Sequence, residues 1–198
     1  MTRDFFARPT LEVARDCLGA LLVRVEGNDR VSGTIVEVEA YIGEQDLACH
    51  AKAGRTQRTR VLYAQPGHAY VYFTYGMHWL LNFVTEAEGS PAAVLIRAVE
   101  PVTGRHLIAA RRKALPERQW TNGPGKVCRS FAIDGRFNGA DLCAPDAALF
   151  VEAGIPVPDA EVLRSARVGM NNVPEPWKSV PWRFVKAGGY RSSAFSPR

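Results

Sequence analysis

Apolar and polar residues follow two different periods along this chain, and these periods predict both helices and strands. In residues 11–22 the apolar positions recur at helical spacing, directly after Pro9-Thr10, which is a typical helix start. In residues 33–41 they alternate with a period of two, which is typical of a strand. The N-terminal part of the chain should therefore contain one helix and one strand.

Two β-rich runs follow in the central part of the chain. Residues 68–74 and 78–84 flank Tyr75-Gly76, and this arrangement predicts a β-hairpin. The remaining expected elements are a buried strand at 92–99, a helix at 104–115, and a turn at 122–125 followed by a short helical stretch.

The order of these elements bears on the fold class. Strands and helices without regular alternation favour an α+β fold over a doubly wound sheet. A length of 198 residues suits one domain, and the chain shows no internal repeat or dividing linker. We expect a single domain over residues 1–198.

Charge is distributed unevenly along the chain. Lys plus Arg number 25 and Asp plus Glu number 20, which gives a net charge of +5. Residues 1–50 hold five basic and nine acidic residues, so the positive excess lies in the remainder. A basic surface attracts phosphate backbones, although a basic domain without a nucleic-acid partner fits the same numbers.

Composition also bears on cofactors and on the cellular setting. The four cysteines are scattered, and the four histidines match no metal-binding spacing, so we expect no metal and no other cofactor. No apolar stretch approaches the ~20 residues that a bilayer requires. The N-terminus has an acid and a proline where a secretion signal needs an apolar core. We expect an intracellular protein that is not bound to a membrane.

Aromatic residues are concentrated between residues 41 and 78. This segment contains five of the six tyrosines and three of the four histidines. Such side chains could form a pocket for a planar heterocycle, or they could pack a β-sheet. The period-two pattern also places Glu37, Glu39 and Tyr41 on one strand face. A carboxylate beside a ring-binding wall could position water and stabilise positive charge on a sugar, but the spacing by itself favours a solvated strand face.

Ordered sequence blocks along nearly the whole chain resemble the alkyladenine (3-methyladenine) DNA glycosylase family, the monofunctional type of animals and bacteria. The blocks are EVEAYIGEQDLACH at 37–50, GHAYVYFTYGM at 67–77, VLIRAVEP at 94–101, NGPGKVC at 122–128, RVG at 167–169 and PWRF at 181–184.

The resemblance implies a fold and an activity. The expected fold is one mixed domain around a curved antiparallel sheet, with a protruding hairpin that enters DNA. The expected enzyme flips alkylated or deaminated purines (3-methyladenine, 7-methylguanine, hypoxanthine, ethenoadenine) out of duplex DNA. A Glu-activated water then hydrolyses the N-glycosidic bond and leaves an abasic site, without β-lyase activity. Damaged double-stranded DNA is the expected partner, and a monomer the expected form.

Residue roles carry over to matching positions. Glu39 matches the catalytic carboxylate, and Arg97 matches the arginine that helps to hold the water. The other matches are Tyr41, His50 and Tyr72 as walls around the flipped base, Asn82 as the group that excludes guanine, and Tyr75 with Met77 beside it as the intercalating tip. Because the remainder of the chain carries the positive excess, Lys126, Arg111 and Arg112 are candidate contacts to the DNA backbone.

Three other functions remain open at this point. The same pocket could belong to a non-catalytic module that binds damaged DNA, or to a hydrolase of free purine nucleosides. An RNA-binding or formyltransferase-type accessory domain could also share the fold. These alternatives differ in whether a carboxylate and an intercalating residue are needed.

Overall fold

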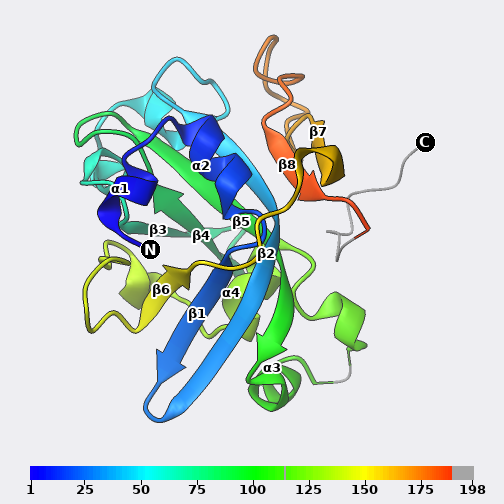
Figure 1. The fold of residues 1–198 in the computed structure, drawn as a ribbon. Helices are drawn as coiled ribbons and strands as arrows, with labels where there is room; N and C mark the ends of the chain where they lie inside the picture. The colour runs from blue at the N-terminus through cyan, green and yellow to red at the C-terminus, as the bar shows by residue number, and fades with distance from the viewer. Residues whose placement is uncertain (114, 189–198) are drawn as a thin grey trace.

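One antiparallel sheet runs through the centre of the molecule (Figure 1). The computed structural model describes residues 1–113 and 115–188, and the eight strands within them all belong to this sheet. The strands are β1 (Leu21–Glu26), β2 (Asp29–Ile42), β3 (Ala69–Thr74), β4 (His78–Val84), β5 (Ala92–Thr103), β6 (Leu149–Glu152), β7 (Val162–Ser165) and β8 (Arg183–Lys186). Most follow the order β3-β4-β5-β2-β1-β6, while β8 pairs with β2 and β7.

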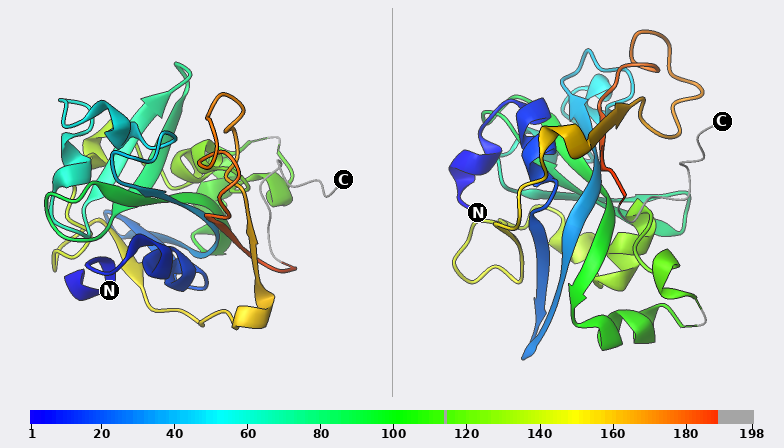
Figure 2. Two further views of the ribbon diagram at one scale, coloured as in Figure 1. Left: turned by 90° about the horizontal axis from the view of Figure 1, so that it is seen from above. Right: turned by 45° about the vertical axis from the view of Figure 1, so that its right-hand side comes forward.

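Helices cover both faces of the sheet. They are α1 (Arg3–Phe6), α2 (Thr10–Cys17), α3 (Arg105–Arg111) and α4 (Pro124–Ser130). Figure 2 shows α2 on one face and α3 and α4 on the other. The expected α+β class is therefore confirmed, with a large antiparallel sheet that is not closed.

The core lies between the sheet and these helices. Phe6 of α1 meets Phe83 of β4 edge to face, with ring centroids 5.8 Å apart. Both rings are fully buried, as are Phe131 after α4 and Phe184 of β8. Large aromatic side chains from distant parts of the chain thus join α1, the sheet and α4 into one apolar core.

The expected helix over residues 11–22 is wrong in its second half. Helix α2 ends at Cys17, and Leu21 and Leu22 belong to β1. The chain reverses at Gly19, whose φ is +90°. A Cβ atom at Gly19 would lie 2.0 Å from the carbonyl oxygen of Ile155, so only glycine fits there. The two leucines continue the apolar pattern, but they do so as part of β1, in which Leu22 is buried and Leu21 is half-buried.

The other expected elements are found with shifted ends. Residues 33–41 lie within β2, and residues 92–99 lie within β5. The expected helix at 104–115 is shorter, because α3 covers 105–111, and residue 114 lies outside the described residues. The turn at 122–125 overlaps α4, which begins at Pro124, where a missing N–H is harmless.

The β3–β4 ribbon contains the segments expected to form a hairpin. The two strands pair antiparallel from Ala69 opposite Phe83 to Thr74 opposite His78. At the connection, Tyr75 and Gly76 have φ values of +51° and +65°. Positive φ is usual in tight connections between antiparallel strands, but a tyrosine rarely adopts it.

Three irregularities interrupt the pairing of β2 with β5, and two of them lie close together around Glu37. Ile35 lies opposite Val99 and Glu37 opposite Ala98, so Val36 has no direct partner on β5. The pairing then shifts again between Glu37 and Val38, which leaves Arg97 without a direct partner on β2. Bulges of this kind redirect side chains, and here the second one lies beside two glutamates.

The same part of β2 has a neighbouring strand on each edge. Glu37 and Glu39 pair with β5 on one edge and with Val185 and Arg183 of β8 on the other. The side chains of both glutamates are fully buried as well. The expectation of a solvated strand face is therefore wrong.

The helices of the described residues are short. Within residues 1–113 and 115–188, none combines the length and apolar character that crossing a bilayer requires.

The aromatic core predicts a difference between two phenylalanines of the β3–β4 ribbon. Replacing buried Phe83 by alanine should lower the free energy of unfolding by about 3–5 kcal/mol, because it leaves a cavity against Phe6. Replacing Phe73, which is 44% exposed, should have a much smaller effect. Urea denaturation measures both values, and equal losses would contradict this description of the core.

Candidate active site

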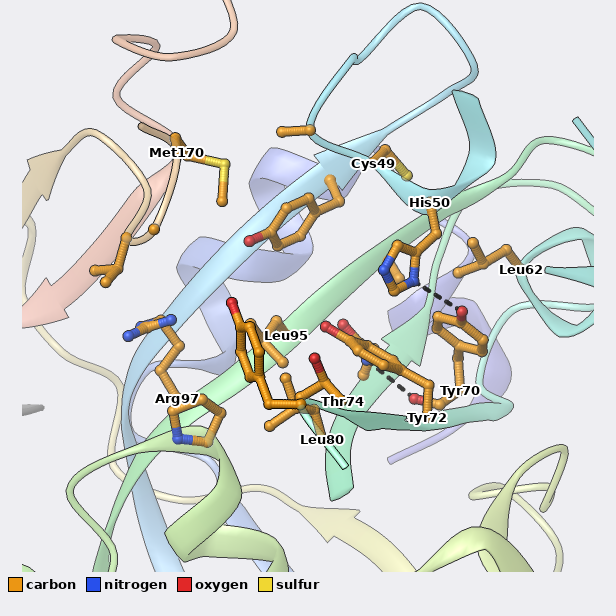
Figure 3. Close-up of a pocket in the computed structure, with 18 residues that line it drawn as sticks. Cys49, His50, Leu62, Tyr70, Tyr72, Thr74, Leu80, Leu95, Arg97 and Met170 are labelled. Atoms are coloured by element: carbon orange, nitrogen blue, oxygen red, sulfur yellow. Dashed lines mark hydrogen bonds between the residues drawn. The ribbon is translucent and has the colours of Figure 1, made fainter. Parts of the chain in front are cut away.

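A cavity of about 330 Å³ lies at one end of the sheet (Figure 3). Its walls come from the end of β2, the turn before His50, Leu62, the β3–β4 ribbon, β5, the start of α4 and the segment 168–170. The lining residues that carry aromatic rings, polar groups or charge are Tyr41, Cys49, His50, Tyr70, Tyr72, Thr74, Tyr75, Asn82 and Arg97. Segments that are distant in the sequence thus contribute to one site.

Aromatic rings form one wall of the cavity. The ring of His50 meets Tyr72 at 4.5 Å between centroids, and Tyr70 lies 5.4 Å from Tyr72. The hydroxyl of Tyr70 and Nδ1 of His50 share a hydrogen bond of 2.9 Å (Figure 3). The concentration of aromatics between residues 41 and 78 therefore produces a pocket, while Tyr63 packs in a neighbouring apolar cluster.

His50 is an uncharged part of this wall. Burial, with added repulsion from the cations Arg58 and Lys52, lowers its pKa to about 4. The imidazole ring is consequently neutral near pH 7. A neutral ring offers a face for stacking and one nitrogen for hydrogen bonding.

Asn82 lies on β4 at the inner end of the cavity. Its Nδ2 donates a hydrogen bond of 3.0 Å to the carbonyl oxygen of Tyr70 on the paired strand. The side chain is buried. This bond fixes the orientation of the amide group against the cavity.

Glu39 lies directly behind the Tyr41 side of the cavity. Oε2 accepts hydrogen bonds from the Tyr41 hydroxyl at 2.8 Å and from Nη1 of Arg97 at 3.2 Å. Oε1 accepts a third, of 2.7 Å, from the backbone N–H of Val168. The three donors belong to residues that line the cavity, so the carboxylate is held in one position at its edge.

Tyr41 remains a hydrogen-bond donor in this arrangement. Burial, followed by the negative charge of Glu39, raises the pKa of Tyr41 well above its usual value. The hydroxyl group therefore keeps its proton and donates a hydrogen bond to Glu39. The expected pairing of carboxylate and ring on one strand face is present in the structure.

Arg97 joins two carboxylates. Its Nε donates to Oε1 of Glu37 at 2.9 Å, and its Nη1 reaches Glu39. Burial alone would lower the pKa of Arg97, but the charges of Glu39 and Glu37 outweigh burial and raise it. Arg183 donates to the same oxygen of Glu37 at 2.8 Å. Glu37 thus balances two guanidinium groups.

A second ion pair lies on the other side of Tyr41. Arg167 contacts both oxygens of Asp46, at 2.5 and 2.9 Å, and both side chains are inaccessible to solvent. Within the described residues the buried carboxylates are Glu37, Glu39 and Asp46, and each is paired with a buried arginine: Arg97, Arg167 or Arg183.

The connection between β3 and β4 extends the rim of the cavity into solvent. Tyr75 lines the cavity and is 86% exposed, and Met77 is 66% exposed. Exposed apolar side chains on a projecting turn are unusual unless they meet a partner. Tyr75 also adopts a strained φ, and strain of this kind is often retained at functional sites.

The three expected contacts to the DNA backbone lie in different surroundings. Lys126 follows Pro124 of the cavity by two residues, and its Nζ donates to Oδ1 of Asn122 at 2.7 Å. Arg111 instead pairs with Glu26 of β1 at 2.7 Å, and Arg112 is buried. Lys126 is therefore the one of the three that lies beside the cavity.

Several residues of the site escaped the sequence analysis. Asp46, Arg167 and Arg183 belong to the sequence blocks that show the resemblance, yet their ion pairs span 121 and 146 positions. The backbone N–H of Val168 leaves no trace in a residue pattern. The available signal for a buried arginine partner such as Arg183 was the presence of two glutamates, Glu37 and Glu39, within a largely apolar strand.

Comparison of the sequence with known proteins shows the family to which the chain belongs. The family model described as Methylpurine-DNA glycosylase (MPG) matches residues 4–189. A protein of Methanocella arvoryzae is 50% identical over 185 residues, which cover 93% of this chain and 90% of the relative. A protein of Myxococcus xanthus is 47% identical over 92% of this chain and 88% of its own length. Both bear the name "Putative 3-methyladenine DNA glycosylase". The chain belongs to the methylpurine-DNA glycosylase family.

The lowered pKa of His50 predicts a pH-dependent loss of stability. The unfolded chain takes up a proton at this residue near pH ~6.5, whereas the folded protein does so only at about pH 4. The free energy of unfolding should therefore fall as the pH decreases through this window. His50→Gln should show a smaller fall than the parent between pH 7 and pH 5 in urea denaturation.

A matched control isolates this effect. His106 is exposed on α3, so His106→Gln should retain the pH dependence of the parent. If His50→Gln and the parent lost equal stability on acidification, His50 would not be the neutral histidine described above.

Proposed function

We propose that this protein is a DNA glycosylase of base-excision repair, which removes damaged purines from duplex DNA. The observation that carries the proposal is the Glu39 carboxylate, which three donors fix at the edge of an aromatic cavity whose rim bears an exposed tyrosine. Membership of the methylpurine-DNA glycosylase family and the names of the relatives support the same activity.

The cavity suits a purine that has left the base stack. The reactive carbon, C1′ of the nucleotide's sugar, is inaccessible within a duplex, so the nucleotide must rotate outward. Tyr41 on one side and His50 with Tyr72 on the other would hold the base between rings, where each stacked base gains about 1–3 kcal/mol. Asn82 would face the purine edge and disfavour the exocyclic amine of guanine, because its amide is already fixed.

Glu39 would activate the attacking water. The water oxygen bonds to C1′ of the sugar, the bond from C1′ to the base nitrogen breaks, and the base leaves with that electron pair. Glu39 accepts the proton of the water, and its negative charge stabilises the positive sugar during the reaction. Arg97 keeps the carboxylate aligned through a planar group that a lysine could not replace.

The same site could process chemically different lesions. Alkylation at N3 or N7 places a positive charge on the purine, so 3-methyladenine and 7-methylguanine leave readily. Neutral lesions such as hypoxanthine and ethenoadenine need additional help, for which ring protonation is a route. Among the described residues that line the cavity there is no lysine to form a Schiff base, which favours a monofunctional enzyme without β-lyase activity.

The β3–β4 ribbon would insert into DNA. Tyr75, with Met77 beside it, would occupy the space that the flipped nucleotide leaves and so offset the unstacking energy of a few kcal/mol. Lys126 would contact a phosphate near the cavity. Burial and then the charge of Arg112 lower the pKa of Lys126, and such repulsion between cations is relieved by a bound anion. The protein would act as a monomer.

Substituting the carboxylate tests the chemistry. Glu39→Gln should still bind a duplex with a lesion, because the aromatic walls remain, but it should release base at least ~100-fold more slowly. Base release from a hypoxanthine duplex under single-turnover conditions and gel-shift affinity measure the two properties separately. Release at the parental rate would exclude Glu39 as the catalytic group.

Truncating the exposed tyrosine distinguishes a DNA enzyme from a nucleoside hydrolase. Tyr75→Ala should slow base release from duplex DNA by about tenfold or more, since a wedge worth a few kcal/mol is lost. Release from a free modified nucleoside, if any occurs, should be unchanged. Phe73→Ala, on the same ribbon, is the control and should resemble the parent. Equal activity of Tyr75→Ala on duplex DNA would contradict the role of the ribbon.

A further inference from the structure

The Arg167 guanidinium group connects three parts of the site. Its Nη1 donates to the carbonyl oxygen of Ala40 at 3.0 Å, and its Nη2 donates to that of Trp177 at 3.1 Å. The same two nitrogens bind the two carboxylate oxygens of Asp46. Arg167 thereby ties strand β2 to Asp46 and to the segment around Trp177.

Aromatic rings enclose this guanidinium group. The Cζ atom of Arg167 lies 4.7 Å from the ring centroid of Tyr41 and 5.2 Å from that of Trp182. A planar cation between two rings, with four hydrogen bonds in its plane, has a single orientation. The backbone that carries Arg167 is consequently fixed relative to Tyr41.

The next residue makes the contact that matters for chemistry. The N–H of Val168 donates to Oε1 of Glu39 at 2.7 Å. The other two donors, Tyr41 of β2 and Arg97 of β5, bond to Oε2 instead. Val168, Gly169 and Met170 also line the cavity. The position of this N–H depends on the backbone that Arg167 holds.

Asp46 connects the ion pair to the opposite wall. Its Oδ1 accepts from the N–H of Ala48 at 3.0 Å, and its backbone carbonyl accepts from the N–H of Cys49 at 2.8 Å. These bonds shape the turn that leads into His50. One buried carboxylate therefore anchors both the His50 turn and the Val168 segment.

We infer that Arg167 and Asp46 are positioning residues, which hold the Val168 N–H against Glu39 and thereby set the direction of the catalytic carboxylate. The inference rests on the proposed function, because it assigns these residues to the reaction attributed to Glu39. Neither side chain lines the cavity, so both act through Val168 and Glu39 rather than on the substrate.

A role in stability alone explains the pair less well. Burying two charges is unfavourable, and a buried ion pair is often no more stable than apolar side chains of the same volume. Its bonds do specify one geometry, which apolar packing would not. This geometry places the Val168 N–H within hydrogen-bond distance of Oε1 of Glu39.

Hydrogen exchange tests the contact without any reference to activity. In the parent protein the Val168 amide should be protected, whereas the amides of the exposed residues Gly169, Asn171 and Asn172 should exchange quickly. Asp46→Asn keeps Oδ1 as an acceptor for Ala48 but removes the charge that pairs with Arg167. It should therefore lose protection at Val168. Rapid exchange of this amide in the parent would overturn the inference.

Kinetics test the consequence. Asp46→Asn should slow single-turnover base release on the order of 10–100-fold, as expected for a misplaced catalytic group, with the dissociation constant for lesion DNA changed less than about threefold. Combining it with Glu39→Gln should cause little further loss on 7-methylguanine DNA, whose charged base gives a measurable residual rate. Multiplicative losses would indicate a merely structural role and would overturn the inference.

Two further variants complete the experiment. Arg167→Lys keeps the charge but cannot make four bonds in one plane, so it should reproduce the kinetic pattern of Asp46→Asn. Asp141→Asn is the matched control, because Asp141 also pairs with an arginine, Arg3, at 2.6 Å and accepts from the N–H two residues later. It should react like the parent. A parent that released no base from any lesion would refute the proposed function, while the exchange result would still decide the contact.

Discussion

The pairing of buried charges is the constraint on which the rest of this structure depends. Three buried carboxylates pair with three buried guanidinium groups at the cavity, which Arg97 also lines. Removing one partner from such a network leaves the other charge unpaired and costs about 3–5 kcal/mol. Strands β2, β5 and β8 and the segment 167–168 each contribute a member, so the pairing also determines how these segments meet.

The site follows from this network. Because Arg97 and the Val168 N–H hold Glu39, the carboxylate is already aligned before a substrate enters, and preorganised groups of this kind are effective in catalysis. The aromatic walls add a neutral slot beside it. The fixed charge of Glu39 on one side of the cavity and the uncharged aromatic rings on the other would suit the proposed reaction, in which a flat base departs and positive charge develops on the sugar.

Local patterns predicted the features that depend on neighbouring residues. A period of two correctly placed Glu39 beside Tyr41, and the aromatic concentration correctly indicated a pocket. The helix at 11–22 failed because Leu21 and Leu22 pair with β2 and β6 as part of a strand, and Leu22 is buried within the sheet rather than by a helix. The burial of Glu37, the bulge at Arg97 and the pair between Arg167 and Asp46 arise from contacts over long sequence separations, which no local pattern contains. The roles taken from the family resemblance remain proposals.

The most direct test of the central claim is a crystal structure of Glu39→Gln bound to duplex DNA that carries a single ethenoadenine. The account predicts the modified base outside the stack, between the ring of Tyr41 and those of His50 and Tyr72, with C1′ facing the side chain at position 39 and Tyr75 filling the gap in the helix. A base that stays stacked in the duplex, or one bound away from the cavity, would contradict it.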